Sequence, residues 1–316
     1  MSIVGQIDDP TEHAAVHLAQ REALNDALDL DLDLGVVSLL DDPATHLAVH
    51  SEDREALAGA GSSVSQADLG WRLGYAEGHV AAHLAEARAR ILFTMSVLLR
   101  ATTAEEEDWT ASDPWRNEGS AGSALDAAVG DITPILSDGK FTADDGTGEP
   151  GWWLHSGFEI PNNDLWNPTI GADALTIVHD WTPLDAPNAK GYWHYDGVDL
   201  TTAGSGFVSE ELDYGPPYQF YVWSANDLGP ENPATIGVPV SPAAFGTRRV
   251  DVARISGDTL SLFRDGAPVG TFDMTGRGPI ASTALLKLGQ PSDHYSFAAV
   301  DRALTDAEIA ALSLAE

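Results

Sequence analysis

Residues 249–266 read Arg-Val-Asp-Val-Ala-Arg-Ile-Ser-Gly-Asp-Thr-Leu-Ser-Leu-Phe-Arg-Asp-Gly, and this stretch decides the fold. It joins two short strand-like runs, residues 248–255 and 259–264. Asp265-Gly266 supplies the positive φ of a tight hairpin turn. Similar runs separated by Gly, Pro, Asn and Asp occupy residues 151–160, 174–181, 191–195, 206–212, 218–224, 270–274, 284–288 and 295–300. Many short strands with regular turns predict an all-β jelly-roll sandwich over residues 132–316.

The end of this region carries a recognisable order. Leu-Leu-Lys-Leu-Gly at residues 285–289 precedes Phe-Ala-Ala-Val-Asp-Arg-Ala-Leu-Thr-Asp-Ala-Glu-Ile at residues 297–309. The order resembles the concanavalin A-like lectin/glucanase superfamily in its laminin G-like form. The resemblance covers residues 132–316 and implies the sandwich fold and a lectin-like domain, without naming a ligand. Thr305 is expected to cap a short closing helix that has Asp306 and Glu308 in its first turn.

The N-terminal part contains a unit that repeats three times at a step of 33 residues. Each copy carries two histidines four residues apart: His13 and His17, then His46 and His50, then His79 and His83. Repeats at such a period indicate helical modules, so residues 1–72 are expected to form two helical anchor repeats and residues 73–100 a third. Residues 7–93 also resemble the openings of minor tail and fibre proteins of tailed bacteriophages. That family often has Asn where Leu18, Ser51 and Leu84 stand here.

The third copy continues into the longest predicted helix, residues 78–100. Apolar residues in it alternate between spacings of four and three, which is typical of a coiled-coil seam. The seam residues are Val80, Leu84, Ala87, Ile91 and Leu98. A single helix of this kind is marginal in water, so we expect a homotrimer; the alternative is a core helix of a monomeric bundle. Residues 101–131 are interpreted as a linker with a short packed segment.

The composition is strongly acidic, with 49 acidic and 16 basic residues spread along the whole chain. This balance argues against nucleic-acid binding, because phosphate contacts need basic side chains. It also argues against an anionic membrane surface. The chain has no cysteine, which excludes disulfides and thiolate metal sites. No signal peptide and no long apolar run is visible in the sequence, so membrane insertion is not expected.

The β region lacks the carboxylate motif that a glucanase needs. Glucanases of the resembled superfamily place Glu-x-Asp-x-x-Glu or Glu-x-Asp-x-Glu on one strand, because retaining hydrolysis needs two nearby carboxyl groups. The nearest match is Glu211-Leu212-Asp213, and Gly215 and Pro216 follow where the third acid would stand. No Gly-x-Ser-x-Gly, phosphate-loop or His-Glu-x-x-His motif occurs. We therefore expect no hydrolase activity and no required cofactor.

Aromatic residues of the β region are the candidate glycan contacts, because sugar rings stack on aromatic faces. They are Tyr192, Trp193, Tyr195, Trp153 and Trp166. A place in the jelly-roll core is the alternative for such rings, and we favour it for Trp181. Calcium is the candidate ion for four loop carboxylates, Asp144, Asp145, Asp196 and Asp199. The six repeat histidines could bind a transition metal. The alternative, which we favour, is that they only pack at the starts of the helices.

Taken together, the features predict a fibre or minor tail protein of a tailed phage. On this hypothesis the helical repeats bind other virion proteins, the coiled coil forms a homotrimer, and the lectin-like domain binds host-surface polysaccharide at the virion surface. A virion part made in the host cytoplasm and released by lysis needs no signal peptide. The alternatives are a capsid decoration or head fibre protein of the same build, and a glycan-cleaving tail spike.

Overall fold

A computed structural model describes residues 91–92, 94–106, 108–144, 155–184, 189–195, 206–211, 218–223, 234–238 and 246–313 of the 316-residue chain. The β-sandwich lies within the compact unit Leu92–Leu304. The helix at the C-terminus is described by itself. The seam positions Val80, Leu84 and Ala87 lie outside the described residues, as do all three helical repeats, so the repeats and the trimer stay predictions.

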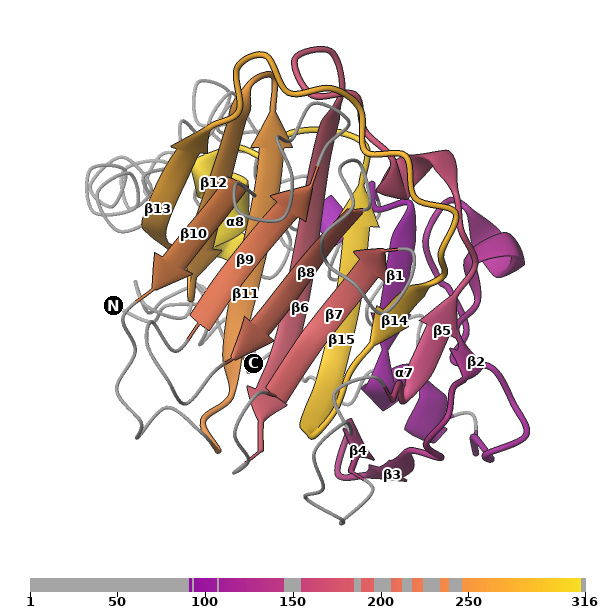
Figure 1. Cartoon of the computed structure of the whole chain (residues 1–316). Coiled ribbons are helices and arrows are strands. Elements are labelled where there is room, and N and C mark those ends of the chain that lie inside the picture. The colour runs from indigo at the N-terminus through magenta and orange to yellow at the C-terminus, as the bar shows by residue number, and fades with distance from the viewer. Residues whose placement is uncertain are drawn as a thin grey trace, which may run out of the picture. The chain divides into compact units, whose positions relative to one another are not determined.

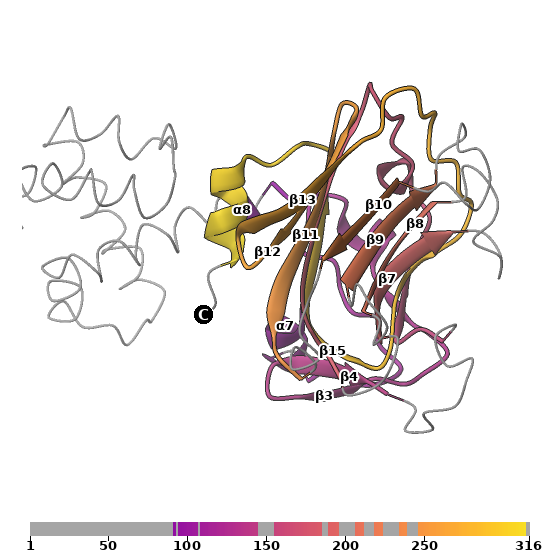
Figure 2. The ribbon, with the colours of Figure 1, turned by 60° about the vertical axis from the view of Figure 1, so that its left-hand side comes forward.

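Two antiparallel sheets form the sandwich, and Figure 2 shows them as two layers. In the described residues the first sheet has eight strands, and β1 (Val97–Arg100) pairs with β15 beside the main path. That path is β13 (Ala267–Asp273), β12 (Thr259–Arg264), β11 (Arg249–Ser256), β6 (Ala174–Pro183), β15 (Ser292–Val300), β4 (Lys140–Ala143) and β3 (Ile135–Ser137). The all-β sandwich predicted from the sequence is thereby confirmed.

The second sheet has seven strands within the described residues (Figure 1). Their order is β10 (Ala234–Val238), β9 (Tyr218–Trp223), β8 (Gly206–Glu211), β7 (Ala189–Tyr195), β14 (Leu286–Leu288), β5 (Phe158–Ile160) and β2 (Ala128–Val129). Short helical segments join the strands: α7 (Ala101–Glu106), η1 (Gly122–Leu125) and η3 (Asp164–Trp166).

Strand β6 is buried on both faces, which differ in chemistry. Leu175, Ile177 and Trp181 belong to the main apolar cluster between the sheets. On the other face Asp180 forms a two-pronged pair with Arg248, with Nε to Oδ1 at 2.9 Å and Nη2 to Oδ2 at 2.7 Å. Alternate residues of a strand point to opposite faces, so the sequence alternation directly produces the two environments.

The local signals near the C-terminus are confirmed. Asp265 and Gly266 both have positive φ, 50° and 78°, as the hairpin between β12 and β13 requires. In α8 (Asp306–Ser313) the hydroxyl of Thr305 accepts from the backbone N–H of Glu308 at 3.2 Å. The Glu308 carboxylate in turn accepts from the Thr305 backbone N–H at 2.8 Å, which completes a capping box.

The predicted helix 78–100 is wrong at its C-terminal end. Residues Val97–Arg100 form β1, in register with Ser296–Ala299 of β15. Leu98 therefore lies in a strand and cannot belong to a helical seam. Ile91, the other described seam residue, is buried and helical. The edge of β15 offers hydrogen bonds that the apolar run 97–99 can use, and this tertiary pairing outweighs the helical spacing.

The predicted linker 101–131 also differs from the structure. Within it, Trp115, Leu125 and Ala127 are buried in the main apolar cluster. Trp115 and Ala127 exchange two backbone hydrogen bonds, at 2.8 and 2.9 Å. The sandwich thus begins well before the expected boundary at Ile132. A composition rich in Gly, Ser and Ala misled the prediction, because small residues also suit a segment that winds tightly over a sheet edge.

The helices of the described residues bear on whether the chain crosses a membrane. None of the helices among the described residues combines the length and the apolar character needed to cross a bilayer.

Candidate functional site

Two of the predicted glycan contacts are core residues. Trp166 is fully buried, and its indole N–H donates to the carbonyl of Pro161 at 3.2 Å. Tyr192 is buried as well, with edge-on contacts to His179 and Phe297. Both belong to the main apolar cluster. Neither ring has a face open to a sugar, so the structure gives them a packing role.

Two further candidates lie on the opposite face of β7. Trp193 and Tyr195 are 4% and 5% exposed and form a separate cluster with Val208 of β8. The register of β7 with β8 sets Trp193 opposite Val208. These rings are enclosed rather than displayed, which differs from the expectation. The fifth candidate, Trp153, lies outside the described residues.

Only one of the predicted metal ligands falls within the described part of the chain. That residue is Asp144, and its side chain is exposed. The other calcium candidates outside the described residues are Asp145, Asp196 and Asp199. All of the repeat histidines lie outside the described residues too, namely His13, His17, His46, His50, His79 and His83.

The described residues offer no substitute for these ligands. Among them, no three His, Asp or Glu side chains gather into a group able to hold a metal ion. Both metal hypotheses therefore stay predictions, calcium at the loop carboxylates and a transition metal at the repeat histidines. The same holds for the favoured alternative, in which the histidines only pack at the helix starts.

A polar layer crosses the core where β6, β11, β12 and β15 meet. Asp251 accepts from the Trp181 indole at 2.8 Å and from Arg264 Nε at 2.7 Å, and Arg249 Nε lies 3.4 Å from it. His179 Nε2 and His294 Nδ1 are 3.0 Å apart, and His294 Nε2 donates to the Gly289 carbonyl at 2.9 Å. Since that carbonyl can only accept, the neutral His294 accepts from His179.

Burial sets the protonation state of this histidine pair. Desolvation lowers the pKa of His294 to about 4, against the opposing influences of its bond to Gly289 and of nearby Asp293. Desolvation, then His294 and Arg249, lower the pKa of His179 well below its usual value. Both rings are therefore neutral near pH 7, and both are fully buried. The layer is a structural element rather than a site for a ligand.

A surface pocket of about 100 Å³ lies beside β1 and α7. We name it the tryptophan pocket and define it by its lining residues, Arg100, Thr103, Ala104, Trp109, Asp113, Pro114, Trp115, Arg116 and Glu118. The segment 108–118 contributes most of these side chains. This segment is irregular, and backbone and side-chain hydrogen bonds together hold it; the Glu118 backbone N–H donates to the Leu98 carbonyl at 2.9 Å.

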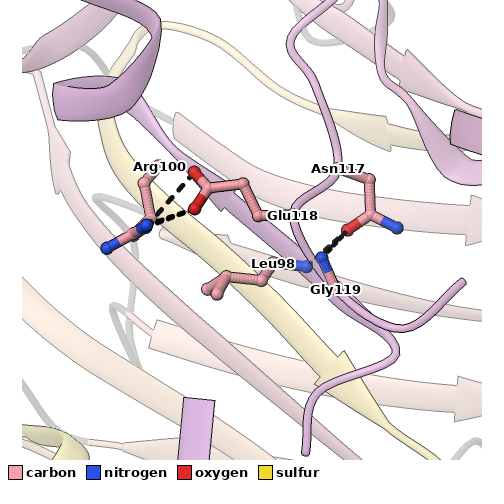
Figure 3. Close-up of polar contacts among 5 residues, drawn as sticks. All are labelled: Leu98, Arg100, Asn117, Glu118 and Gly119. Atoms are coloured by element: carbon pink, nitrogen blue, oxygen red, sulfur yellow. Dashed lines mark hydrogen bonds and ion pairs between the residues drawn. The ribbon is translucent and has the colours of Figure 1, made fainter. Parts of the chain in front are cut away.

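Asn117 fastens this segment to β1. Its Oδ1 accepts from the backbone N–H of Leu98 at 2.8 Å and of Gly119 at 2.9 Å. Its Nδ2 donates to the carbonyls of Ser96 and Gly122 at 3.1 and 3.0 Å. Figure 3 shows the Leu98 and Gly119 amides converging on the Asn117 oxygen. One buried side chain thus bonds to four backbone groups, and the Ser96 carbonyl accepts from the Ala121 backbone N–H as well.

A turn at Thr110–Asp113 holds the first tryptophan. The Asp113 carboxylate accepts from the Thr110 backbone N–H at 3.1 Å and from the Thr110 hydroxyl at 2.6 Å. The Trp109 indole N–H donates to the carbonyl of Asp113 at 3.0 Å. Trp109 is half-buried, and its ring packs edge-on against Phe141 with centroids 4.8 Å apart.

The second tryptophan is held by the core. Trp115 is 1% exposed and contacts Phe141 and Phe158, with ring centroids 4.8 and 5.0 Å away. Its indole Nε1 is buried and meets no acceptor within the part of the chain that the structure describes. Trp N–H groups usually find a partner when buried, and an unmet one costs about 1–3 kcal/mol.

Charges on the rim of the tryptophan pocket balance one another. Arg100 Nε donates to both carboxylate oxygens of Glu118, at 3.2 and 3.0 Å, and Nη2 pairs with the same carboxylate (Figure 3). Hydrogen bonds from the Thr110 hydroxyl and backbone N–H lower the pKa of Asp113, and the positive charge of Arg116 contributes in the same direction. The rim therefore carries two cations and two carboxylates.

A second hollow is wider and lacks aromatic side chains. It measures about 710 Å³ and is lined by Ser96, Ser120, Ala121, Leu125, Asn163, Asp164, Leu165, Pro168, Ala172, Asp173, Ala174, Asp301, Arg302 and Ala303. Several of its polar groups are used within the fold: Asn163 caps η3, and Asp173 accepts from the Thr169 backbone N–H at 2.8 Å. Without a ring surface or an unmet buried donor, it offers less specific chemistry than the tryptophan pocket.

Sequence reasoning missed the tryptophan pocket because it placed residues 101–131 in a linker. One signal was present in the sequence: Trp109 and Trp115 stand on either side of Asp113-Pro114 in an otherwise polar, small-residue stretch. Large aromatic residues are expensive to leave in a solvated linker, so two of them next to a turn indicate a packed loop.

Comparisons with known proteins give a fold likeness and no family. No protein-family model matches the chain, and no curated protein matches it. Among solved structures, the binding domain of botulinum neurotoxin serotype D is similar at 10% identity with a TM-score of 0.50, over 72% of this chain and 52% of that one. The same serotype's ligand binding domain, solved in complex with N-acetylneuraminic acid, has a TM-score of 0.49, 9% identity and coverages of 72% and 52%.

A shorter domain is also similar. The carbohydrate-binding module CBM40 of a Ruminococcus gnavus sialidase, solved with α2,3-sialyllactose, has 12% identity and a TM-score of 0.36, over 45% of this chain and 83% of that one. The chain spans about half the length of the two toxin domains that it matches. At these identities the likeness concerns the fold alone, which in the described part of this chain is a sandwich of two antiparallel sheets.

Proposed function

We propose that the sandwich is a glycan-binding module and that the tryptophan pocket is its binding site. The observation that carries the proposal is the half-buried ring of Trp109, which lines the pocket beside the polar side chains of Thr103 and Asp113. Sugars present ring faces that pack on aromatic side chains and hydroxyl groups that bond to polar ones. Trp115 lines the same pocket and is held by the core.

Rigidity supports the proposal. Both tryptophans rest on Phe141, and the segment between them is fixed by the Asp113 turn and by Asn117. A site that is ordered before the ligand arrives loses less conformational entropy on binding. The toxin domain with the same sandwich is itself a binding domain, which agrees with a binding role for this one.

We also propose that the module does not cleave the glycan. Acid–base hydrolysis needs one carboxyl group that stays protonated near neutral pH. In the tryptophan pocket, hydrogen bonds lower the pKa of Asp113, and Glu118 is paired with Arg100. A carboxyl group whose pKa is lowered is a poor general acid, and the Glu118 carboxylate is already engaged by Arg100.

The wider assignment extends the sequence hypothesis. We propose a homotrimeric fibre or minor tail protein of a phage, displayed on the virion surface, whose helical repeats bind other virion proteins. Its supports are the 33-residue repeat and the resemblance of residues 7–93 to fibre openings. A head fibre or capsid decoration protein of the same build is the alternative. Light scattering on the full chain tests the assembly, and a monomer would contradict the trimeric fibre.

A glycan array with the full chain tests binding. We expect bound glycans, no reducing sugar released on incubation, and loss of binding in Thr103→Tyr, which fills the pocket from its rim. Thr102→Tyr is the matched control, because Thr102 is the exposed neighbour in α7 and does not line the pocket. Equal binding by the two variants would place the site elsewhere, and absence of binding to every glycan would refute the proposed function.

A further inference from the structure

We infer that the tryptophan pocket takes a neutral terminal sugar ring, and that it discriminates against sugars bearing a carboxylate, such as sialic and uronic acids. This inference rests on the proposed function, because it names the ligand class of the same site. Neutral and acidic sugars both present hydroxyl groups and differ in the added carboxylate. The charges and hydrogen-bonding groups around the pocket therefore decide between the two classes.

The charges on the rim of the pocket disfavour an added carboxylate. Specific binding of a carboxylate needs a cation that no protein carboxylate already neutralises. Arg100 is engaged by Glu118 in a forked pair. Arg116 lies close enough to Asp113 to stabilise the ionised form of that carboxylate. An incoming sugar acid would have to compete with a protein carboxylate for each of the two arginines.

A sugar hydroxyl suits the lining of the pocket better than a carboxylate does. Asp113 engages its Oδ2 with Thr110, and no described residue donates to its Oδ1. An anionic acceptor of this kind matches a sugar hydroxyl, which can donate a hydrogen bond. A ligand carboxylate only accepts, and Asp113 would repel it.

The small volume of the pocket and the negative charge of the whole chain also favour a neutral sugar ring. About 100 Å³ is well below the volume of pockets that enclose drug-sized ligands, so one ring enters and the rest of a glycan stays outside. The chain carries a formal net charge of −33 at pH 7. A field of that sign lowers the local concentration of anionic glycans and slows their association.

Matched glycan pairs test the inference on the full chain. Lactose and 3′-sialyllactose, displayed at equal density, differ only in a terminal sialic acid; maltotriose and a uronic acid trisaccharide make a second pair. We expect the neutral member of a bound pair to bind at least about tenfold more tightly, because like charges at an interface are costly. The ratio of affinities for the neutral and acidic glycans should fall in Glu118→Gln, because this variant releases Arg100 from its carboxylate partner. The ratio should stay unchanged in Asp131→Asn, because Asp131 is exposed and lies outside the pocket.

The outcomes separate the two proposals. Tighter binding of the acidic members overturns the inference and leaves glycan binding in place. A preference that Glu118→Gln leaves unchanged also overturns it, because the rim charges would not be its cause. Failure of every neutral and acidic probe to bind overturns the proposed function itself. Thr103→Tyr and Thr102→Tyr then decide whether a measured preference belongs to the tryptophan pocket.

Discussion

Two tryptophan-bearing regions of this molecule differ in how far their aromatic side chains are buried. The run Tyr192–Tyr195 is the aromatic-rich stretch that the sequence marks as a binding surface, and its described rings are enclosed on both faces of β7. The tryptophan pocket comes from a stretch that reads as a linker, and it reaches the surface with one ring half-buried and one indole N–H unmet among the described residues. A strand packs side chains on both of its faces, whereas the loop over the sheet edge buries Trp115 and leaves Trp109 half-buried at the surface.

The largest expected effect distinguishes the regions by stability. Tyr192→Ala should lower the free energy of unfolding by about 3–5 kcal/mol, because it removes a fully buried aromatic ring from the core. Ile135→Ala is the control, since Ile135 is 68% exposed and its truncation should change stability by less than about 0.5 kcal/mol. Urea unfolding followed by circular dichroism measures both. A small change in the free energy of unfolding for Tyr192→Ala would mean that the ring is not a core residue and could still contact a ligand.

The core should also be the acid-sensitive region. In the unfolded chain a histidine titrates near pH 6.5, whereas burial lowers the pKa of His294 to about 4 in the folded protein. Between these values the unfolded chain binds the extra proton, so stability present above about pH 6.5 falls as the pH drops. The loss is on the order of 3 kcal/mol for His294, and burial of His179 acts in the same direction.

A pair of titrations checks this origin. The free energy of unfolding of the full chain is measured between pH 7 and 4 and compared with that of His294→Asn. The variant should be less stable at pH 7 and should lose less on acidification. Parallel curves would assign the acid sensitivity to carboxylates instead, and would leave the histidine pair without influence on the pH dependence.

Asn117 should matter to the pocket more than to the core. Asn117→Ala should cost about 2–3 kcal/mol of stability, because buried backbone groups of the segment 96–122 lose their partner. Asn117→Asp keeps an acceptor for Leu98 and Gly119 but turns a carboxylate oxygen toward the carbonyls of Ser96 and Gly122, so it should cost at least as much. Hydrogen exchange should show faster exchange at residues 108–122 and unchanged protection in β6 and β11. Uniform loss of protection would mean that the segment folds as one unit with the core.

The smallest stability effect is expected at the rim. Arg100 and Glu118 are 43% and 24% exposed, and an ion pair of that kind contributes about 0.2–1 kcal/mol. Glu118→Gln should therefore unfold at nearly the same urea concentration as the parent chain while altering ligand preference. A stability loss above about 2 kcal/mol would make the pair a structural support and weaken its proposed role in selectivity.

Particular residues show how far prediction from sequence reached. The hairpin at Asp265-Gly266 and the capping box at Thr305 and Glu308 were predictable, because each depends on contacts within a few residues. Ten strand runs were expected, and β6, β7, β8, β9, β11 and β12 closely match them. Strands β1 to β4 and β10 were not predicted. They are short, or they exist through pairing with a distant strand, as β1 does with β15.

The amino-acid sequence by itself determined the two-sided strands, the tight turn and the cap of the closing helix, because alternation, positive φ and hydrogen bonds between near neighbours are local properties. Tertiary structure alone decided which rings are enclosed, that Val97–Arg100 is a strand, and that Asn117 bridges four backbone groups. The contact between His179 and His294 joins residues 115 positions apart. Burial and pairing at such separations depend on how two complete sheets meet, and no local pattern encodes that arrangement.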